Sequence, residues 1–527
     1  MLGIKFYAPV TKSTYGKKEH IGQVYRKSSI TFRPTKTSAK QVERGQVEDG
    51  FYVDMVMKTT SAWPSITEPG RVAYLGDSSH VTLLTHQEQN AGNAVHYLIP
   101  NNSRGTRSSR SNIDMVENQI LAQRGAFVLP LRSISDQLVE SYFTWVHPII
   151  PVINRARFMR QYRDPKNPPS ILLLQAVFLA GSHIYKATHN ENATAEVSVF
   201  TFYKRAKALY DANYEDDRIV IVQSLVLLGW YQGGSAEAVE SVCDWNRLAI
   251  VVAQGCGLHR CVDGSQLSHT DKSLRRRIWW TLFSRDRFTA MSFGRPPCIN
   301  LEDSDVTMIT EQDFVELSSQ RDSRYSLEPQ QVQFYLQYVK LSQLAGVILS
   351  QHYSVATLLS GEAREIRLID QMLVDWLKDC PSSMSWKSTQ YEFWPALLHL
   401  KYYTAVCLLH QSTTFATATP SPQSTSNNPS EIVALEAADM IVTIAEVLMS
   451  QDQLKYCPSF TTYSLLSAGS VYIYQIRCST SSFRQILRRK LGSLELSLGD
   501  ISRVWGIGKV AYELFQKVID EKAPECI

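Results

Sequence analysis

The chain has 527 residues, of which 44% are hydrophobic and 20% are charged. This length fits one large domain or two to three ordinary ones, and the composition excludes a chain that is disordered throughout. Nine cysteines at irregular spacing, without a C-x-x-C pair, favour reduced thiols in a cytosolic or nuclear protein over a secreted disulfide framework.

Residues 1–50 are polar and basic, and they are predicted to form a disordered arm. Residues 1–44 contain ten basic and two acidic residues, a net charge of +8, which leaves −4 for the rest of a chain whose total is +4. Such an arm is typical of a segment that contacts nucleic acid or an import receptor. The alternative is a solvated leader without a partner, because the charges are scattered rather than clustered. The first residues contain no apolar run suited to a signal peptide.

Residues 51–125 are predicted to be a linker with one short extended segment, GRVAYLGDSS at 70–79, followed by a turn. The Ser/Arg-rich sequence at 101–113 predicts a loop. Residues 126–527 almost lack strict two-residue alternation, and they are predicted to form a large all-α domain. Within this domain, the low-complexity segment 412–430 predicts a flexible loop between two helices.

The helices expected in this domain have apolar residues on more than one side, which favours a multi-layered bundle over a repeat solenoid. In chain order they are expected at 133–147, 171–185, 196–213, 218–232, 238–255, 271–293, 331–349, 363–377, 391–409, 431–450, 464–476 and 494–520. The most apolar segments, 171–181 and 219–231, are shorter than the ~18 residues that a bilayer span needs. Both are therefore predicted to be core helices.

The segment from Ser273 to Asp305 has the sequence SLRRRIWWTLFSRDRFTAMSFGRPPCINLEDSD, with three arginines directly before two tryptophans. Wound as a helix capped by Asp271, at about 100° per residue, its apolar side chains lie on all sides, which is typical of a buried helix. Arg275, Arg276 and Arg277 then point in three directions and form no shared cationic face for phosphates.

These arginines are instead expected to be neutralised inside the protein. Arg275 is expected to lie over Trp279, and Arg276 over Trp280, or else each reaches a nearby carboxylate. The nearby acids are Asp286, Glu302, Asp303 and Asp305. The sequence Gly294-Arg-Pro-Pro is expected to end the helix.

Several motifs, taken in order, resemble the regulatory (middle homology) domain of fungal zinc-cluster transcription factors. They are LVESYFTWVHPIIPVINRARFMRQY at 138–162, AIVVAQGCGLHR at 249–260, the run RRRIWW, RDR, GRPPCIN and EDSDV within 275–306, and LLH at 408–410 before a variable loop. GRVAYLGDSS resembles a stretch upstream of this domain in the cutinase-activator branch. The resemblance covers residues 70–520 and implies a helical regulatory domain.

The resemblance implies a set of residues that are characteristic of this domain and have a structural role. They are Arg275, Arg276, Arg277, Trp279, Trp280, Arg285, Asp286, Arg287, Gly294, Arg295, Pro296 and Pro297. No catalytic, cofactor-binding or metal-binding residue is predicted.

The chain departs from the family at its N-terminal part. Family members carry six cysteines there, in two C-x2-C-x6-C-type halves that bind two zinc ions, whereas this chain has no cysteine before Cys243. We therefore expect no zinc cofactor in this chain. Three explanations stay open: the protein acts through a partner, the basic arm makes non-specific DNA contacts, or an upstream zinc-cluster exon precedes the recorded start.

The expected function is that of a nuclear transcriptional regulator of a metabolic or specialised-metabolite gene set. Its helical body would bind a small-molecule effector or a protein partner and shift between conformations. Expected partners are the transcription machinery, DNA through the arm or a partner protein, and a second subunit in a homo- or heterodimer; no membrane is expected. The alternatives are a co-regulator without direct DNA binding and, less favoured, an all-α enzyme.

Three further patterns are each more simply explained by structure. Cys256, His259 and Cys261 do not have zinc-ligand spacing and suit the end of a helix. The acids of 215–217 suit a helix N-terminus, and 506–509 lacks the residues of a phosphate loop. The following aromatic residues either line a small-molecule cavity or pack the core: Trp230, Tyr231, Trp245, Trp279, Trp280, Trp376, Trp394 and Trp505.

Overall fold

The computed structural model describes residues 69–76, 96–98, 107–189, 197–232, 236–316, 327–355, 357, 366–387, 389, 391–414, 429–478 and 481–522. Within these residues the protein is helical apart from one two-stranded sheet, so the predicted all-α class is confirmed. The predicted basic arm at 1–50 lies outside the described residues, as does 415–428, the centre of the predicted loop.

The segment before the helical body contains a strand pair and a helix. Strand β1 (Val72–Tyr74) pairs antiparallel with β2 (His96–Leu98), and Val72 is fully buried against Val262 and Leu267. Helix α3 spans Arg107–Gln123. The loop predicted over 101–113 is therefore wrong from residue 107 onward, because the helix-favouring residues that follow extend the helix upstream through the serines.

A first group of helices packs around α6, which contacts α4, α7 and α8. Its members are α4 (Arg132–Ser141), a π-helical turn (Tyr142–Val146), α5 (Arg155–Arg163), α6 (Ile171–Thr188), α7 (Val199–Asp211), α8 (Arg218–Leu228) and α9 (Ala236–Gly255). By length and composition α6 could cross a membrane, but 78% of it is buried inside the protein, which identifies it as the core helix that the sequence predicts. Gly181 permits its close approach to α4, because a Cβ there would lie 2.1 Å from the Leu138 carbonyl oxygen.

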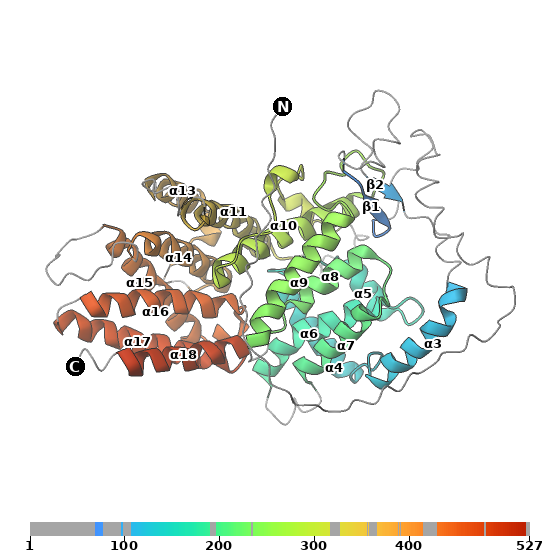
Figure 1. The fold of residues 1–527 in the computed structure, drawn as a ribbon, viewed down its shortest axis with the longest axis horizontal. Helices are drawn as coiled ribbons and strands as arrows, with labels where there is room; N and C mark the ends of the chain where they lie inside the picture. Colours follow the sequence, from blue (N-terminus) through green and yellow to red (C-terminus); the bar gives the residue numbers. More distant parts are fainter. Residues whose placement is uncertain are drawn as a thin grey trace, which may run out of the picture. The chain divides into compact units, whose positions relative to one another are not determined.

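The second group contains α13 (Ile366–Asp379), α14 (Phe393–Thr414), α15 (Pro429–Ser450), α16 (Phe460–Cys478), α17 (Ser481–Ser502) and α18 (Gly506–Lys522). Consecutive helices from α14 to α18 pack against one another. Helix α10 (His269–Phe293) lies between the two groups and contacts α9, α11 and α16 (Figure 1). Helix α11 (Pro329–His352) packs against α10, α13 and α14. The helices thus form a layered bundle, with α10 near its centre.

Some predicted boundaries are wrong for identifiable reasons. The helix predicted over 494–520 is two helices, because Trp505 is buried and donates from Nε1 to the Cys457 carbonyl at the break. The sequence also gave no prediction of α5, which begins where the Asn154 side chain accepts from the Arg157 N–H at 2.7 Å. Helix α14 extends to Thr414 and α15 begins at Pro429, so both ends of the predicted 412–430 loop are helical.

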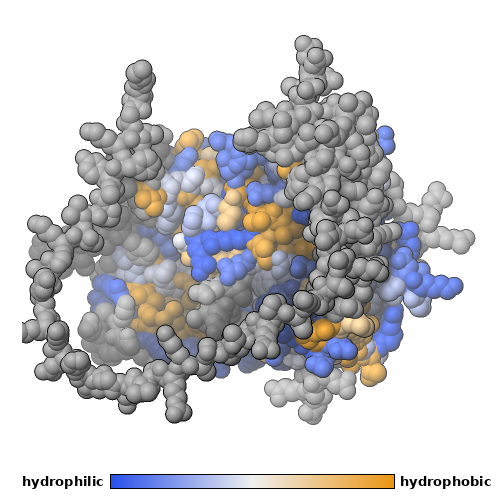
Figure 2. All heavy atoms as spheres, turned by 45° about the vertical axis from the view of Figure 1, so that its right-hand side comes forward, coloured by the Kyte–Doolittle hydropathy of each residue, from blue (hydrophilic) through white to orange (hydrophobic). Residues whose placement is uncertain are grey.

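The surface differs from the interior in the way its apolar residues are grouped. On the face shown in Figure 2, hydrophobic residues form separate patches among hydrophilic ones. Inside, one hydrophobic cluster runs from α3 to α18 through both groups of helices. The largest continuous apolar contacts are therefore internal, as expected for a single folded body.

Candidate functional site

Helix α10 carries the predicted characteristic residues through the interior. It begins after Ser268, whose side chain accepts from the Asp271 N–H, so Ser268 is the N-cap and the predicted cap, Asp271, is wrong by one turn. Apolar side chains are buried on all of its sides. Arg275 and Arg277 are each only 2% exposed, which confirms the predicted interior placement.

Arg275 is held by backbone carbonyl groups. Its guanidinium donates to the carbonyl oxygens of Pro69, Cys256 and Gly257 at 2.9–3.1 Å. The last two follow the end of α9, where unpaired carbonyls carry the negative end of the helix dipole. Burial lowers the pKa of Arg275 from its ordinary value. Arg275 therefore ties α10 to the end of α9 and to the segment before β1.

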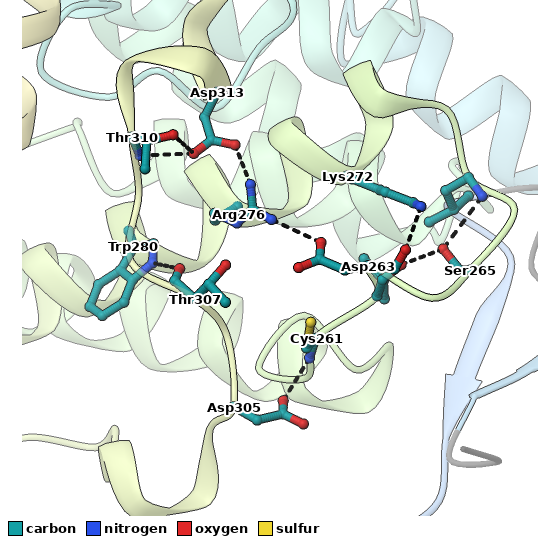
Figure 3. A network of polar contacts seen from close by, with 12 residues as sticks. Cys261, Asp263, Ser265, Lys272, Arg276, Trp280, Asp305, Thr307, Thr310 and Asp313 are labelled. Carbon is teal, nitrogen blue, oxygen red and sulfur yellow. Dashed lines mark hydrogen bonds and ion pairs between the residues drawn. The ribbon is translucent and has the colours of Figure 1, made fainter. Parts of the chain in front are cut away.

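Arg276 is the most exposed of the three arginines and joins two loops to α10 (Figure 3). It donates to Asp263, in the loop before α10, at 2.9 Å, and to the buried carboxylate of Asp313. Asp313 also accepts from the backbone N–H of Thr310 at 2.9 Å, which closes the short helical turn Glu311–Phe314. The network fixes both the loop that precedes α10 and the segment that follows it in the sequence.

Arg277 pairs with Glu316, and both side chains are almost completely buried. The Glu316 carboxylate also accepts from the backbone N–H groups of Arg155 and Ala156, the first residues of α5, at 3.1 and 2.8 Å. A carboxylate at a helix N-terminus is favoured by the dipole. This contact joins α5, α10 and the segment before residue 317.

The expected partners of the arginine triplet are therefore wrong in detail. The carboxylates are Asp263, Asp313 and Glu316, while Asp305 pairs with Arg260 at 3.2 Å. The expected stacking of Arg275 on Trp279 and of Arg276 on Trp280 is replaced by these polar contacts. Both tryptophans are buried core residues, and Trp280 donates from Nε1 to the Thr307 carbonyl at 2.9 Å.

The second half of the motif closes the loop that follows α10. Asp286 is 4% exposed and accepts from Arg287 at 2.7 Å and from the backbone N–H groups of Cys298 and Ile299 at 3.0 Å. Arg287 in turn donates to the Ile299 carbonyl at 2.5 Å. Burial raises the pKa of Asp286 more than these N–H groups and Arg287 lower it.

Gly294 ends α10 in the left-handed conformation, with φ of 61°, as the sequence predicts. Arg295 follows it half-buried, and Pro296 and Pro297 are exposed. The characteristic residues thus do not converge on one site: they hold α10, α9, α5 and three loops together.

Arg285 is also on α10, but it takes no part in these contacts. It lines a cavity of about 300 Å³. The cavity lies between the two groups of helices, with walls from the segment that follows α8 and from α9, α10, α11, α14, α16 and α18. The lining is mostly apolar, and its second cation is Lys401 of α14, which is 2% exposed. Sequence reasoning missed Lys401, although a lone lysine within the apolar run FWPALLHLKYYTAVCLLH of α14 is an available signal.

Comparisons with known proteins agree with this structure. Residues 139–378 match the fungal specific transcription factor domain. This segment of the chain is therefore a fungal specific transcription factor domain. The matched region contains α10 with all the characteristic residues, whereas Lys401 and the cavity walls from α16 and α18 lie beyond it.

Three relatives indicate the range of the family. The chain is 49% identical to cutinase transcription factor 1 alpha of Fusarium vanettenii, over 93% of this chain and 54% of the relative. It is 28% identical to the acetamidase regulatory protein of Aspergillus oryzae, over 93% and 60%. It is 32% identical to the fusaric acid cluster transcription factor FUB12 of Gibberella fujikuroi, over 33% and 26%. The chain spans little more than half the length of the first two.

The other sequence patterns are placed as follows. Asp217 is the N-cap of α8 and accepts from Ile219 and Val220, as expected of a helix N-terminus. Within the described residues no three His, Cys, Asp or Glu side chains are placed to hold a metal ion. Of the aromatic residues that were expected to line a cavity or pack the core, Trp230 lines the cavity beside Arg285.

Proposed function

We propose that this chain regulates transcription of a metabolic or specialised-metabolite gene set from the nucleus, through a helical domain that responds to a ligand or partner. The observation that carries the proposal is the domain match over 139–378, together with relatives that are transcription factors or regulatory proteins. The proposal includes no catalytic reaction and no resident cofactor. It includes the transcription machinery as partner and a homo- or heterodimer as the assembly.

The conformational part of the mechanism is supported by the position of the cavity. Its walls come from both groups of helices, so a molecule bound there contacts both at once. A ligand that fits one arrangement of the two groups better than another shifts the population toward it. The surface that a partner protein meets would change accordingly.

The first test is genetic. In a fungal strain that lacks the gene for this chain, we expect coordinated loss or gain of a defined set of transcripts, restored by the wild-type chain. The measurement is RNA sequencing of deleted and complemented strains. Unchanged transcripts across carbon and nitrogen sources would remove the proposal, and a metabolite defect without a transcript change would instead favour the all-α enzyme.

The second test concerns the basic arm. Deleting residues 1–44, which carry the net charge of +8, is expected to reduce nuclear retention and DNA retention, and the lost DNA retention should be the salt-sensitive part. The measurement is fluorescence imaging of tagged chains and DNA pull-down over a salt series. A chain whose DNA retention is absent or insensitive to salt would act as a co-regulator through a partner.

A further inference from the structure

The cavity between the two groups of helices is lined by two basic side chains that form no ion pair with any carboxylate in the part of the chain that the structure describes. Arg285 makes one hydrogen bond, to the Gly229 carbonyl at 3.2 Å, and its Nε has no partner. Lys401 forms no ion pair with a carboxylate of the described residues. Its Nζ lies instead 3.8 Å from the ring centre of Phe460, 4.3 Å from that of Phe288 and 4.8 Å from that of Tyr338.

The titratable groups that act on Lys401 include a second cation and no carboxylate of the described residues. Burial, the largest cause, and the positive charge of Arg285 on α10 lower the pKa of Lys401 to about 7, while Cys457 acts to raise it. Burial also raises the pKa of the Cys457 thiol to about 12, and it raises those of the Tyr338 and Tyr463 hydroxyls, so these groups are neutral at pH 7. Two like charges in an apolar cavity without a counter-ion are a strong indication of a missing anion.

The contrast with the rest of α10 strengthens this point. Arg276, Arg277 and Arg287 each have a carboxylate of the protein within ion-pair distance. Arg285, on the same helix, has none among the described residues and lines the cavity instead. Arg275 also lacks a carboxylate, but three carbonyl groups hold it, whereas Arg285 has one such contact among the described residues and lines the cavity.

We infer that this cavity binds a small organic carboxylate with an apolar body, whose carboxylate lies between Lys401 and Arg285. The inference deepens the proposed function. The regulatory role of the ligand rests on that function, whereas its binding to the cavity does not. A single planar carboxylate matches a guanidinium and an ammonium group and leaves the apolar lining for the rest of the molecule. The volume of about 300 Å³ is at the lower end of small-molecule sites.

Other ligand classes fit less well. An organic cation would meet two like charges, and a neutral apolar molecule would leave both cations without an anion. An inorganic anion would leave the aromatic lining, which includes Phe288, Phe460 and Tyr463, without contact. Two further buried polar atoms at the wall, Nε1 of Trp230 and Oγ1 of Thr462, have no partner within the described residues and can donate to a carboxylate.

The experiment uses the purified full chain and four probes with the same ten-carbon body: decanoate, decan-1-ol, decylamine and decyl phosphate, all below their micelle concentrations. We expect decanoate to raise the thermal unfolding temperature and to bind in calorimetry, because a ligand of the folded state alone stabilises it. Decan-1-ol and decylamine are expected to bind at least about tenfold more weakly, since each lacks the charge-assisted hydrogen bonds.

Two lysine variants make the test specific to the cavity. Lys401→Met is expected to weaken decanoate binding at least about tenfold, while Lys401→Arg retains it in part. Lys509→Met is the matched control, because Lys509 lies on α18 next to the lining residue Val510 but is 69% exposed. It is expected to bind decanoate like the wild-type chain.

Several outcomes would overturn the inference. These are no binding of decanoate, equal binding of decan-1-ol, equal binding by the Lys401→Met chain, or a clear preference for decyl phosphate, which would assign the site to phosphate esters. The two proposals fail separately. Decanoate binding together with unchanged transcripts in the deletion strain would overturn the proposed function and support the carboxylate site. Changed transcripts without decanoate binding would support the function and overturn the site.

Discussion

Replacing Asp286 with alanine is expected to lower the free energy of unfolding by about 3–5 kcal/mol, because it leaves the buried Arg287 guanidinium without its anion. The same change removes the acceptor of the Cys298 and Ile299 N–H groups, which hold the loop after α10. The loss is therefore larger than that of a single neutral hydrogen bond, about 1 kcal/mol. The measurement is urea unfolding followed by tryptophan fluorescence, with the midpoint and slope compared between variants.

A double variant separates the unpaired charge from lost packing. If most of the lost stability comes from the unpaired charge of Arg287, Asp286→Ala combined with Arg287→Met is expected to be more stable than Asp286→Ala alone. Asp211→Ala is the surface control, because its pair with Lys207 is nearly half exposed on both sides and should contribute no more than about 1 kcal/mol. Equal losses for Asp211→Ala and Asp286→Ala would show that the buried contacts of Asp286 do not hold the loop.

The sequence predicted the environment of α10 well because helical periodicity depends only on nearby residues. Apolar side chains on every side require burial wherever the helix lies, so the interior position of Arg275 and Arg277 followed. The partners did not follow, because they come from other segments. Asp313 and Glu316 lie 37 and 39 residues from the arginines that they neutralise.

The carbonyl contacts of Arg275 could not be predicted from the sequence for the same reason. They come from the end of α9 and from Pro69, which lies 206 residues away. Sequence reasoning searched for carboxylates within the motif, where Asp286 indeed pairs with its neighbour Arg287. Asp263 and Asp313 lie outside the motif, and only folding brings their loops to Arg276.

The cavity, like the contacts of Arg275, could not be predicted from the sequence. The aromatic residues that pack the core and those that line the cavity are alike in sequence, and only the packing of α10, α16 and α18 separates them. Lys401 was detectable as a lone charge in an apolar helix, but its significance depends on the absence of a carboxylate nearby. Among the described residues, that absence depends on how six helices pack together and on no single segment.

Replacing Lys401 with methionine is expected to stabilise the ligand-free chain by about 2–4 kcal/mol at pH 6.5. Lowering the pKa of a lysine from 10.5 to about 7 corresponds to about 5 kcal/mol of cost for the charged form. The cation–π contacts with the three rings offset about 1–2 kcal/mol of this. Methionine has a similar length and no charge, so it fills the same space without that cost. The measurement is urea unfolding at several pH values.

The pH dependence of the free energy of unfolding tests the cost of charging Lys401 in a second way. Below pH 7 the lysine is protonated in both states, and the folded chain bears the full cost of the charge. Between pH 7 and the unfolded pKa the unfolded chain binds more protons, so stability rises with pH, by at most about 1.4 kcal/mol per unit. The lowered pKa values of buried histidines, among them His183 and His399, also make stability rise with pH until their unfolded pKa of about 6.5 is passed. The raised pKa values of Cys407 and Cys457 act in the opposite direction above about pH 8.5, so about pH 7.5–8.5 is the informative range.

The Lys401→Met chain should lack this rise, and the Lys509→Met chain, altered at an exposed position, should keep it and stay within about 0.5 kcal/mol of the wild type. A Lys401→Met chain that is less stable than the wild type at pH 6.5, with an unchanged pH slope, would mean that the ammonium group already has its anion. The inference that the cavity binds a carboxylate would then be wrong. A gain in stability together with lost carboxylate binding is the opposite combination, and it is typical of a residue kept for a ligand at the expense of the fold.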